Sequence, residues 1–251
     1  MLEVHVLASG SDGNCAVVQF EDRAVMIDAG LSYKRTKELM NVSGIDETAI
    51  DALLITHEHS DHICGAGAVA RKLGIPVMCN QNTFNAGSFG KVDYSPIVTL
   101  HGFTVAGMNI LPLPTSHNAA EPNAFLLDTE DGKVLVATDT GRLTYQVEHA
   151  LSEADIAIIE ANYDKHMLDV GPYPLRLRQL IDSEVGHMSN VACAEAIKKT
   201  MNEKRQIFLA HLSKKNNTPD TARETVSEIT GIKRYRLDCL EFAGDTRVLR
   251  V

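Results

Sequence analysis

The sequence of 251 residues contains no tryptophan, few aromatic residues and no long apolar run. Aromatic side chains make up only 5% of the chain, so Val, Ile and Leu must fill most of the core. No stretch approaches the roughly 20 apolar residues that a transmembrane helix needs. The first residues lack a basic segment followed by a long apolar stretch, which a secretion signal would have. We therefore expect a cytoplasmic protein with no membrane partner.

A disulfide framework is also missing. The five cysteines are odd in number, far apart and form no CxxC pair: Cys15, Cys64, Cys79, Cys193 and Cys239. This pattern favours free thiols in a reducing compartment.

The net charge of −9 gives little sign of a protein that coats nucleic acid electrostatically. However, this figure omits bound cations, and two divalent ions would add about four positive charges to one cleft. The global charge therefore does not exclude an anionic substrate.

The remaining sequence alternates short strands with helices. Alternating and β-branched runs predict strands at 2–8, 15–20, 23–27, 52–56, 76–78, 98–100, 103–105, 108–113, 124–128, 133–138, 156–160, 206–210 and 248–251. Helices are predicted at 32–40, with Ser32 as the N-cap, and at 65–73, 143–152, 175–183 and 190–201. No repeat or linker divides the chain, so we expect a single α/β domain over residues 1–251. The mixture predicts two sheets with helices on their outer faces.

One hexapeptide carries an unusual density of metal-binding side chains. His57-Glu58-His59-Ser60-Asp61-His62 directly follows the apolar run 52–56. Neutral imidazole and carboxylate are the ligands that Zn²⁺ and similar ions prefer. A core strand selected only for stability would not crowd titratable groups at its tip. The hexapeptide therefore predicts a metal site, with Glu58 and Ser60 supporting the loop.

Three further candidates also lie just beyond apolar strands: His117, Asp139 and His211. Strand ends on one side of a sandwich form a floor from which loops deliver ligands. Taken singly, His117 is equally well read as a loop histidine and Asp139 as a turn residue. Joined to the hexapeptide, they complete a ligand set of seven residues.

The order His-x-His-x-Asp-His, lone His, Asp, last His resembles the metallo-β-lactamase fold superfamily over essentially the whole chain. The resemblance implies a four-layer αβ/βα sandwich with two mixed sheets and a dinuclear site. It implies that His57, His59 and His117 bind one ion, that Asp61, His62 and His211 bind the other, and that Asp139 bridges them. It also implies that Asp28 supports the metal loop by hydrogen bonds without ligating.

A dinuclear site predicts hydrolysis. Two ions about 3.5–4 Å apart lower the pKa of a bridging water to near 7, which supplies hydroxide at neutral pH, and they polarise the electrophile. Metal ligands alone do not choose between an ester, a thioester, an amide and a phosphodiester. Zn²⁺ and Mn²⁺ both accept nitrogen and oxygen ligands, so the sequence does not decide which metal is bound.

Glu160 and His187 bear on the choice of substrate. Glu160 ends the strand 156–160, and His187 lies just before the helix 190–201. A phosphodiester expels an alkoxide, and a histidine kept protonated by a carboxylate can donate the proton that this leaving group needs, typically worth about 10²–10⁴-fold. The plainer alternatives are a helix-starting histidine and a salt-bridged glutamate.

The pair resembles the Glu and His motifs of the nuclease branch, as in tRNase Z and RNase J. We therefore expect Asp61, Glu160 and His187 to act in catalysis, with Glu160 orienting His187 and His187 protonating the leaving oxygen.

Four segments together are similar to the YycJ/WalJ group: 9–14, 160–164, 186–190 and 210–217. The group implies a 5′-to-3′ DNA exonuclease, cytosolic and linked to DNA repair, with DNA favoured over RNA. Met188 stands where Leu is common in the group. Only 71 residues separate Asp139 from His211, too few for the inserted clamp domain of RNase J-type enzymes. The oligomeric state stays open.

Candidate substrate contacts are Ser11, Asn14, Arg176, Lys214 and Asn216. The loop 9–14 either offers backbone N–H groups to a phosphate or is only a tight turn. Arg176 and Lys214 either hold phosphates or are solvated surface charges. Asn216 either bonds substrate or caps its loop.

Two other functions compete. A thioesterase of the glyoxalase II type or a lactonase predicts a small-molecule pocket and no role for His187. A non-enzymatic nucleic-acid binder would be expected to have lost ligands, whereas all seven positions are filled.

Overall fold

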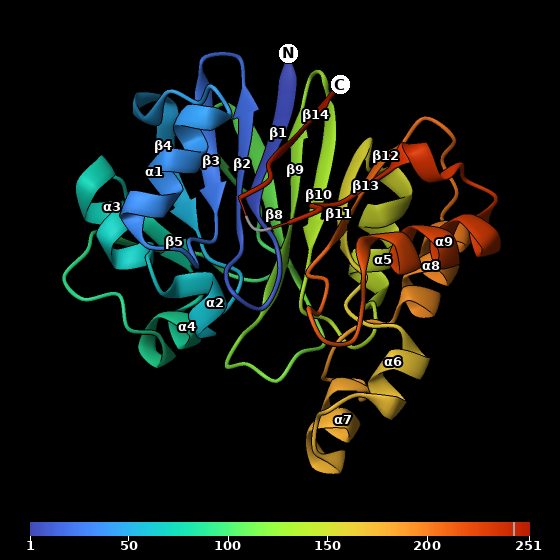
Figure 1. The fold of residues 1–251 in the computed structure, drawn as a ribbon. Coiled ribbons are helices and arrows are strands. Elements are labelled where there is room, and N and C mark those ends of the chain that lie inside the picture. The colour runs from blue at the N-terminus through green and yellow to red at the C-terminus, as the bar shows by residue number, and fades with distance from the viewer. Residues whose placement is uncertain (243) are drawn as a thin grey trace.

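The computed structural model describes residues 1–242 and 244–251. Their strands form two seven-stranded sheets, and helices cover the outer face of each (Figure 1). This is the predicted α/β sandwich with helices outside.

The first sheet has the order β14-β1-β2-β3-β4-β5-β6. Its N-terminal strands pair antiparallel and its later strands parallel. The strands are β1 (Leu2–Ala8), β2 (Cys15–Phe20), β3 (Arg23–Ile27), β4 (Ile50–Leu54), β5 (Val77–Cys79), β6 (Tyr94–Pro96) and β14 (Arg247–Arg250). Its outer face is covered by α1 (Tyr33–Val42), α2 (Ser60–Ile63), α3 (Ala66–Leu73) and α4 (Gln81–Ala86).

The second sheet has the order β13-β12-β11-β10-β9-β8-β7. Its strands are β7 (Phe103–Val105), β8 (Met108–Pro114), β9 (Asn123–Thr129), β10 (Gly132–Ala137), β11 (Ile156–Glu160), β12 (Gln206–Ala210) and β13 (Leu237–Asp238). Helices α5 (Tyr145–Glu153), α8 (Asn190–Lys199) and α9 (Pro219–Thr230) cover its outer face. Helices α6 (Lys165–Val170) and α7 (Leu175–Ile181) extend away from the sandwich at the bottom of Figure 1.

The space between the sheets holds the central apolar core. Val4 and Val18 of the first sheet pack there with Phe125 and Phe208 of the second, all fully buried. Burial of a side chain of this size contributes roughly 1.5–3 kcal/mol. This core fixes the position of one sheet against the other, and so it fixes the relative positions of the loops at their edges.

Several segments differ from the sequence expectation, among them α2, α4, α6 and β13, which were not predicted. The strand predicted at 98–100 is wrong: Leu100 has φ 65°, and the amide of His101 donates to the carbonyl of Val98 in a turn. The pairing strand is β6 instead. Helix α9 was not predicted, although Thr218 caps its first turn and Gly231, with φ 78°, ends it.

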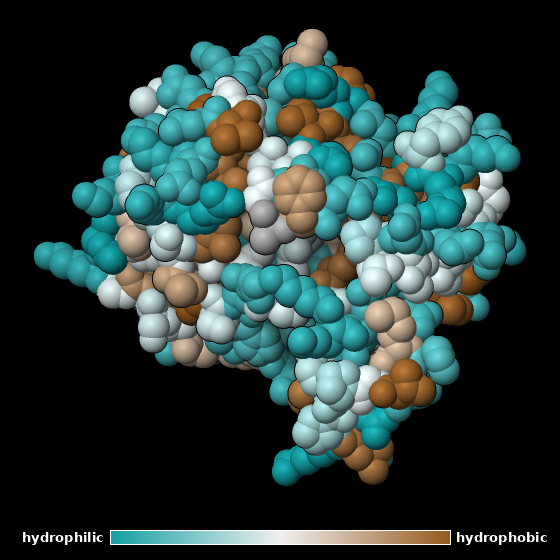
Figure 2. Space-filling model, viewed as in Figure 1, coloured by the Kyte–Doolittle hydropathy of each residue, from teal (hydrophilic) through white to brown (hydrophobic). Residues whose placement is uncertain are grey.

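The face in Figure 2 is mostly hydrophilic, with scattered apolar residues, some of them on the α6–α7 projection. Val170, Leu175 and Leu180 are exposed there. In the described part of the chain, no helix is both long and apolar enough to cross a bilayer.

A candidate dinuclear metal centre

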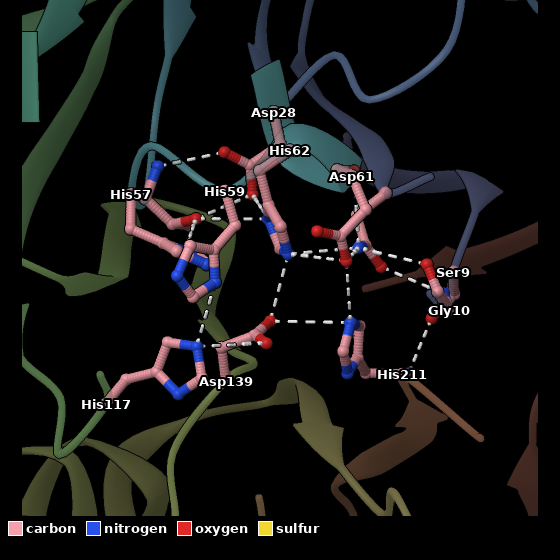
Figure 3. A network of polar contacts seen from close by, with 12 residues as sticks. Ser9, Gly10, Asp28, His57, His59, Asp61, His62, His117, Asp139 and His211 are labelled. Atoms are coloured by element: carbon pink, nitrogen blue, oxygen red, sulfur yellow. Dashed lines mark hydrogen bonds and ion pairs between the residues drawn. The ribbon is translucent and has the colours of Figure 1, made fainter. Parts of the chain in front are cut away.

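The seven predicted metal ligands meet at one edge of the sandwich. The hexapeptide follows β4, while His117, Asp139 and His211 follow β8, β10 and β12. Figure 3 shows their side chains converging from both sheets. Among the described residues four sets of possible ligands form, and two of them share no member: His57, His59 and His117 make the first group, and Asp61, His62 and His211 make the second. Within each group the ligand atoms lie within 4.8 Å of one another.

Bonds on the outer side of each ring orient the histidines of the first group. Nδ1 of His57 donates to Oγ1 of Thr56 at 3.0 Å. Nε2 of His59 donates to the carbonyl of Asn118 at 3.0 Å. Because each ring has given its proton outward, the other nitrogen turns a lone pair toward the cluster.

His117 completes this group from the second sheet. Its Nδ1 donates to the carbonyl of Gly186 at 3.0 Å, so Nε2 faces inward. There it lies 3.2 Å from Nδ1 of His59. Nε2 of His57 is buried and has no hydrogen-bond partner among the described residues. Three inward lone pairs, one of them orphaned, are the donor set that a divalent cation requires.

Asp28 orients the second group. Nδ1 of His62 donates to Oδ2 of Asp28 at 2.8 Å, which leaves Nε2 facing the cluster. The carboxylate also accepts from the amide and the hydroxyl of Thr56, each at 2.9 Å. Asp28 thereby holds the metal loop by the hydrogen bonds that the family resemblance implied.

His211 approaches from β12 with its two ring nitrogens between carboxylates. Nε2 lies 3.2 Å from Oδ2 of Asp61, and Nδ1 lies 3.3 Å from Oε1 of Glu160. A ring in the tautomer with Nδ1 protonated donates to Glu160 and directs its free nitrogen at the second group.

Asp139 lies between the two groups. Its Oδ1 is 3.6 Å from Nε2 of His117, and its Oδ2 is 3.0 Å from Nε2 of His62. Oδ2 is buried without a hydrogen bond among the described residues. Asp28, Asp139 and His211 all have positive φ values of 55–59°, which non-glycine residues rarely adopt. Such backbone strain is typical of functional sites.

The electrostatics of the cluster also fit a cation. Burial holds the pKa of His57 well below its usual range, so this imidazole is neutral. Burial disfavours the charged form of His62 too, but the carboxylates of Asp28 and Asp139 outweigh it and raise its pKa to about 10. The buried carboxylates therefore attract positive charge, which divalent ions would supply. The donor set and the local charge both fit the metal pair.

Glu160 and His187 lie beside the cluster. Nδ1 of His187 donates to Oε1 of Glu160 at 2.7 Å, and the amide of Thr140 donates to Oε2 at 2.8 Å. Glu160 is fully buried, whereas the side chain of His187 is 22% exposed. Burial would lower the pKa of His187, but the charge of Glu160 outweighs burial and raises it. The charge of Glu160 thus favours the protonated form of this imidazole at the edge of the site.

The metal loop approaches Gly30 so closely that no side chain fits at this position. A Cβ on Gly30 would lie 1.7 Å from the carbonyl oxygen of Asp61 and 2.8 Å from the amide of Asn14. The amide of Asn14 donates to this same carbonyl at 2.8 Å. Glycine is required so that the two loops can approach closely.

Sequence reasoning missed several groups that orient ligands. Thr56 links Asp28 to His57, and Nδ2 of Asn162 donates to the carbonyl of His211 at 2.8 Å. Asn162 lies in the motif 160–164, so its position gave a signal. The carbonyls that accept from His59 and His117 gave none, because any residue supplies a carbonyl. Glu58 does support its loop, since it accepts from the amide of Ala120 at 2.8 Å.

The five candidate substrate residues lie in different settings. Ser11 and Arg176 are exposed, and Lys214 is exposed but paired with Asp12. Asn14 is buried, with its amide 3.3 Å from Oδ2 of Asp61. Asn216 is fully buried and bonds Ser213, so the direct substrate contact is not supported and the loop-capping alternative is favoured.

Comparison with known proteins agrees with this geometry. A family model described as a beta-lactamase superfamily domain matches residues 23–212. The chain belongs to the beta-lactamase superfamily. Within it, exodeoxyribonuclease YycJ of Bacillus anthracis is 36% identical over 240 residues, 93% of this chain and 91% of the relative. Exodeoxyribonuclease WalJ of Streptococcus pneumoniae is 38% identical over 232 residues, 88% and 85% of the two chains.

A solved structure shows the same superfamily fold. The metallo-beta-lactamase fold protein YhfI from Bacillus subtilis aligns with a TM-score of 0.76 over 98% of this chain and 99% of its own. At 15% identity this likeness concerns the fold alone. Family, fold and the histidine–carboxylate cluster together identify a metal-dependent hydrolase of the YycJ/WalJ group.

Proposed function

We propose that this enzyme is a nuclease that degrades DNA from the 5′ end in the 5′-to-3′ direction, in the cytoplasm and in DNA repair. The observation that carries the proposal is the Glu160–His187 pair, in which a 2.7 Å hydrogen bond holds an imidazole beside the metal cluster and the carboxylate favours its protonated form. A thioester or lactone expels a better leaving group and has less need of this donor. The relatives named exodeoxyribonuclease support DNA as the substrate, and the five free thiols support a reducing compartment.

The ligand roles follow from the two groups. His57, His59 and His117 would hold one divalent ion, Asp61, His62 and His211 the other, with Asp139 shared and Zn²⁺ or Mn²⁺ as the metal. When bound, the two ions supply an activated water nucleophile and neutralise charge that builds on the phosphate.

The chain's own residues do the remaining work. Glu160 accepts from Nδ1 of His187, so the proton on Nε2 is the one available to the leaving 3′ oxygen. Asp61 is 21% exposed whereas Asp139 is 3% exposed, so Asp61 lies nearer the side from which substrate enters. Asp28 keeps His62 in the tautomer whose unprotonated Nε2 faces the metal cluster.

Substrate grip is proposed for three exposed positions. Ser11 and Lys214 border the His211 side of the site, and Arg176 lies on the α7 projection. We also propose that residues 1–251 act as one domain without an inserted clamp, since the segment between Asp139 and His211 is occupied by α5, β11, α6, α7, α8 and β12.

A substrate panel tests the proposal. Purified protein is loaded with Zn²⁺ or Mn²⁺ and offered end-labelled single- and double-stranded DNA and RNA, bis(p-nitrophenyl) phosphate and a glutathione thioester. We expect stepwise shortening of duplex DNA from the 5′ end, slower action on RNA and no thioester hydrolysis. Thioester hydrolysis without nucleic-acid cleavage would show a glyoxalase II-type enzyme instead.

A further inference from the structure

A cavity of about 310 Å³ lies beside the metal cluster and has no part in the chemistry described above. It is bounded by the loop after β1, by α1 and by two C-terminal segments. We name this cavity the side pocket. Its large apolar lining residues are Leu7, Leu31, Leu39, Leu212, Leu240 and Phe242. Pockets for small organic ligands measure roughly 300–1,000 Å³, so this one has room for a single small ligand.

The side pocket adjoins the second group of metal ligands. Ser9, which lines it, accepts a hydrogen bond from the amide of His211 at 2.7 Å. Leu212, Ser213 and Lys214 also line it and directly follow His211. Figure 3 shows Ser9 and Gly10 on the His211 side of the cluster, away from His117. The side pocket therefore lies on the His211 side of the cluster, next to the second group of ligands.

The charges at the rim are already balanced. Lys214 pairs with Asp12, and Arg35 pairs with Glu38 at 3.1 Å. Glu241, which also lines the pocket, pairs with Arg223. Because these rim charges are paired, the apolar interior suits an uncharged heterocycle better than a phosphate, and Lys214 can grip a backbone phosphate outside the pocket only by leaving Asp12.

Two hydroxyls give the pocket polar specificity. Oγ of Ser9 accepts from His211, and Oγ of Ser213 accepts from the amide of Asn216 at 3.3 Å. Neither hydroxyl donates its own proton to another atom in the described part of the chain. Both can therefore donate to the nitrogen or oxygen acceptors at the edge of a nucleobase.

An aromatic ring stands at the mouth of the pocket. All seven phenylalanines lie within the described residues, and Phe242 alone among them is exposed, at 70%. Base stacking on exposed aromatic rings is a common way to hold single nucleotides without sequence preference. We propose that the side pocket receives the nucleobase next to the cleaved bond, with Phe242 stacking on it. This proposal rests on the proposed nuclease function.

Abasic substrates test the pocket. Duplex DNA is prepared with all bases, or with an abasic residue on either side of the first cleaved bond, and kcat/KM is measured for the wild type and for Phe242→Ala. Tyr235→Ala is the matched control, because Tyr235 is 84% exposed and does not line the pocket. Bis(p-nitrophenyl) phosphate, which has no base, reports the metal chemistry alone.

We expect one of the two abasic positions to lower kcat/KM of the wild type about tenfold, chiefly through KM. Phe242→Ala should lose about tenfold on normal DNA and nothing more on the abasic substrate, with Tyr235→Ala unchanged. All three proteins should hydrolyse bis(p-nitrophenyl) phosphate equally.

The two levels of the proposal fail differently. Efficient cleavage by the wild type that is indifferent to both abasic positions, or full activity of Phe242→Ala on DNA, would overturn the pocket assignment and leave the nuclease intact. Absence of DNA cleavage by the wild type with either metal would overturn the proposed function and the pocket with it.

Discussion

Nδ1 of His59 and Nε2 of His117 face each other across 3.2 Å, while the outer nitrogen of each ring donates to a backbone carbonyl. Two neutral rings in these tautomers direct two lone pairs at the same point. That arrangement is repulsive unless a proton or a metal ion lies between the nitrogens. The hydrogen bonds outside the cluster therefore prepare the site for metal before any metal arrives.

Metal removal should destabilise the fold. Ligand held at about 1,000 times its dissociation constant adds about 4 kcal/mol, and each kcal/mol moves the melting temperature of a domain of this size by roughly 2–4 °C. We expect dialysis against a chelator to lower Tm by about 10 °C and added Zn²⁺ or Mn²⁺ to restore it, as measured by calorimetry. An identical Tm in chelator and in metal would argue against the site.

Asp28→Asn should weaken metal binding without removing a ligand. The variant loses the negative charge that fixes the tautomer of His62, and such supporting groups are typically worth about 10–100-fold in metal affinity. Asparagine tolerates the positive φ of this position, so the backbone is kept. Competition with a fluorescent chelator measures the affinity, with Asp22→Asn, at an exposed turn, as the control. Equal affinities for both variants would show that Asp28 does not orient the metal loop.

His187→Ala should separate substrates by their leaving groups. Cleavage of DNA should fall by about 10²–10⁴-fold, because the departing alkoxide loses its proton donor. Bis(p-nitrophenyl) phosphate should be nearly unaffected, since nitrophenolate leaves without a proton. His166→Ala, an exposed histidine, is the control, and metal content by mass spectrometry checks that the cluster is intact. Full DNA cleavage by His187→Ala would remove the assignment.

Gly30→Ala should disrupt the second metal group through the backbone. The new Cβ would lie 1.7 Å from the carbonyl of Asp61, so the loop that carries Asp61 and His62 must move. We expect one divalent ion per chain to be lost and Tm to fall. Gly102→Ala is the control, since its Cβ meets nothing closer than 3.7 Å. A variant with normal stability and two bound ions would contradict the packing argument.

Much of the fold was predictable from local pattern. Strands β1, β2 and β3 match the predicted ranges because apolar runs are bounded there by turn residues. The failure at 98–100 has a physical cause: three residues with strand-like composition form a turn that closes through a left-handed Leu100. The pattern could not show this, because tertiary pairing selected Tyr94–Pro96 for the sheet instead.

The candidate site was predictable in its members but not in its tautomers. Side chains such as His59 and His117 can be recognised as candidate metal ligands from their residue type and from their position after a strand. The carbonyls of Asn118 and Gly186, which decide which nitrogen faces inward, depend on loops that the fold brings together. Asn216 shows the converse: its motif suggested substrate contact, and its complete burial favours a structural role.

Anomalous X-ray scattering from crystals grown with Zn²⁺ or Mn²⁺ tests the central claim most directly. We predict two peaks per chain, one bounded by His57, His59 and His117 and the other by Asp61, His62 and His211, with Asp139 between them. No peak at these positions, or a single ion held only by Asp139, Glu160, His187 and His211, which also lie within reach of one another, would contradict the account.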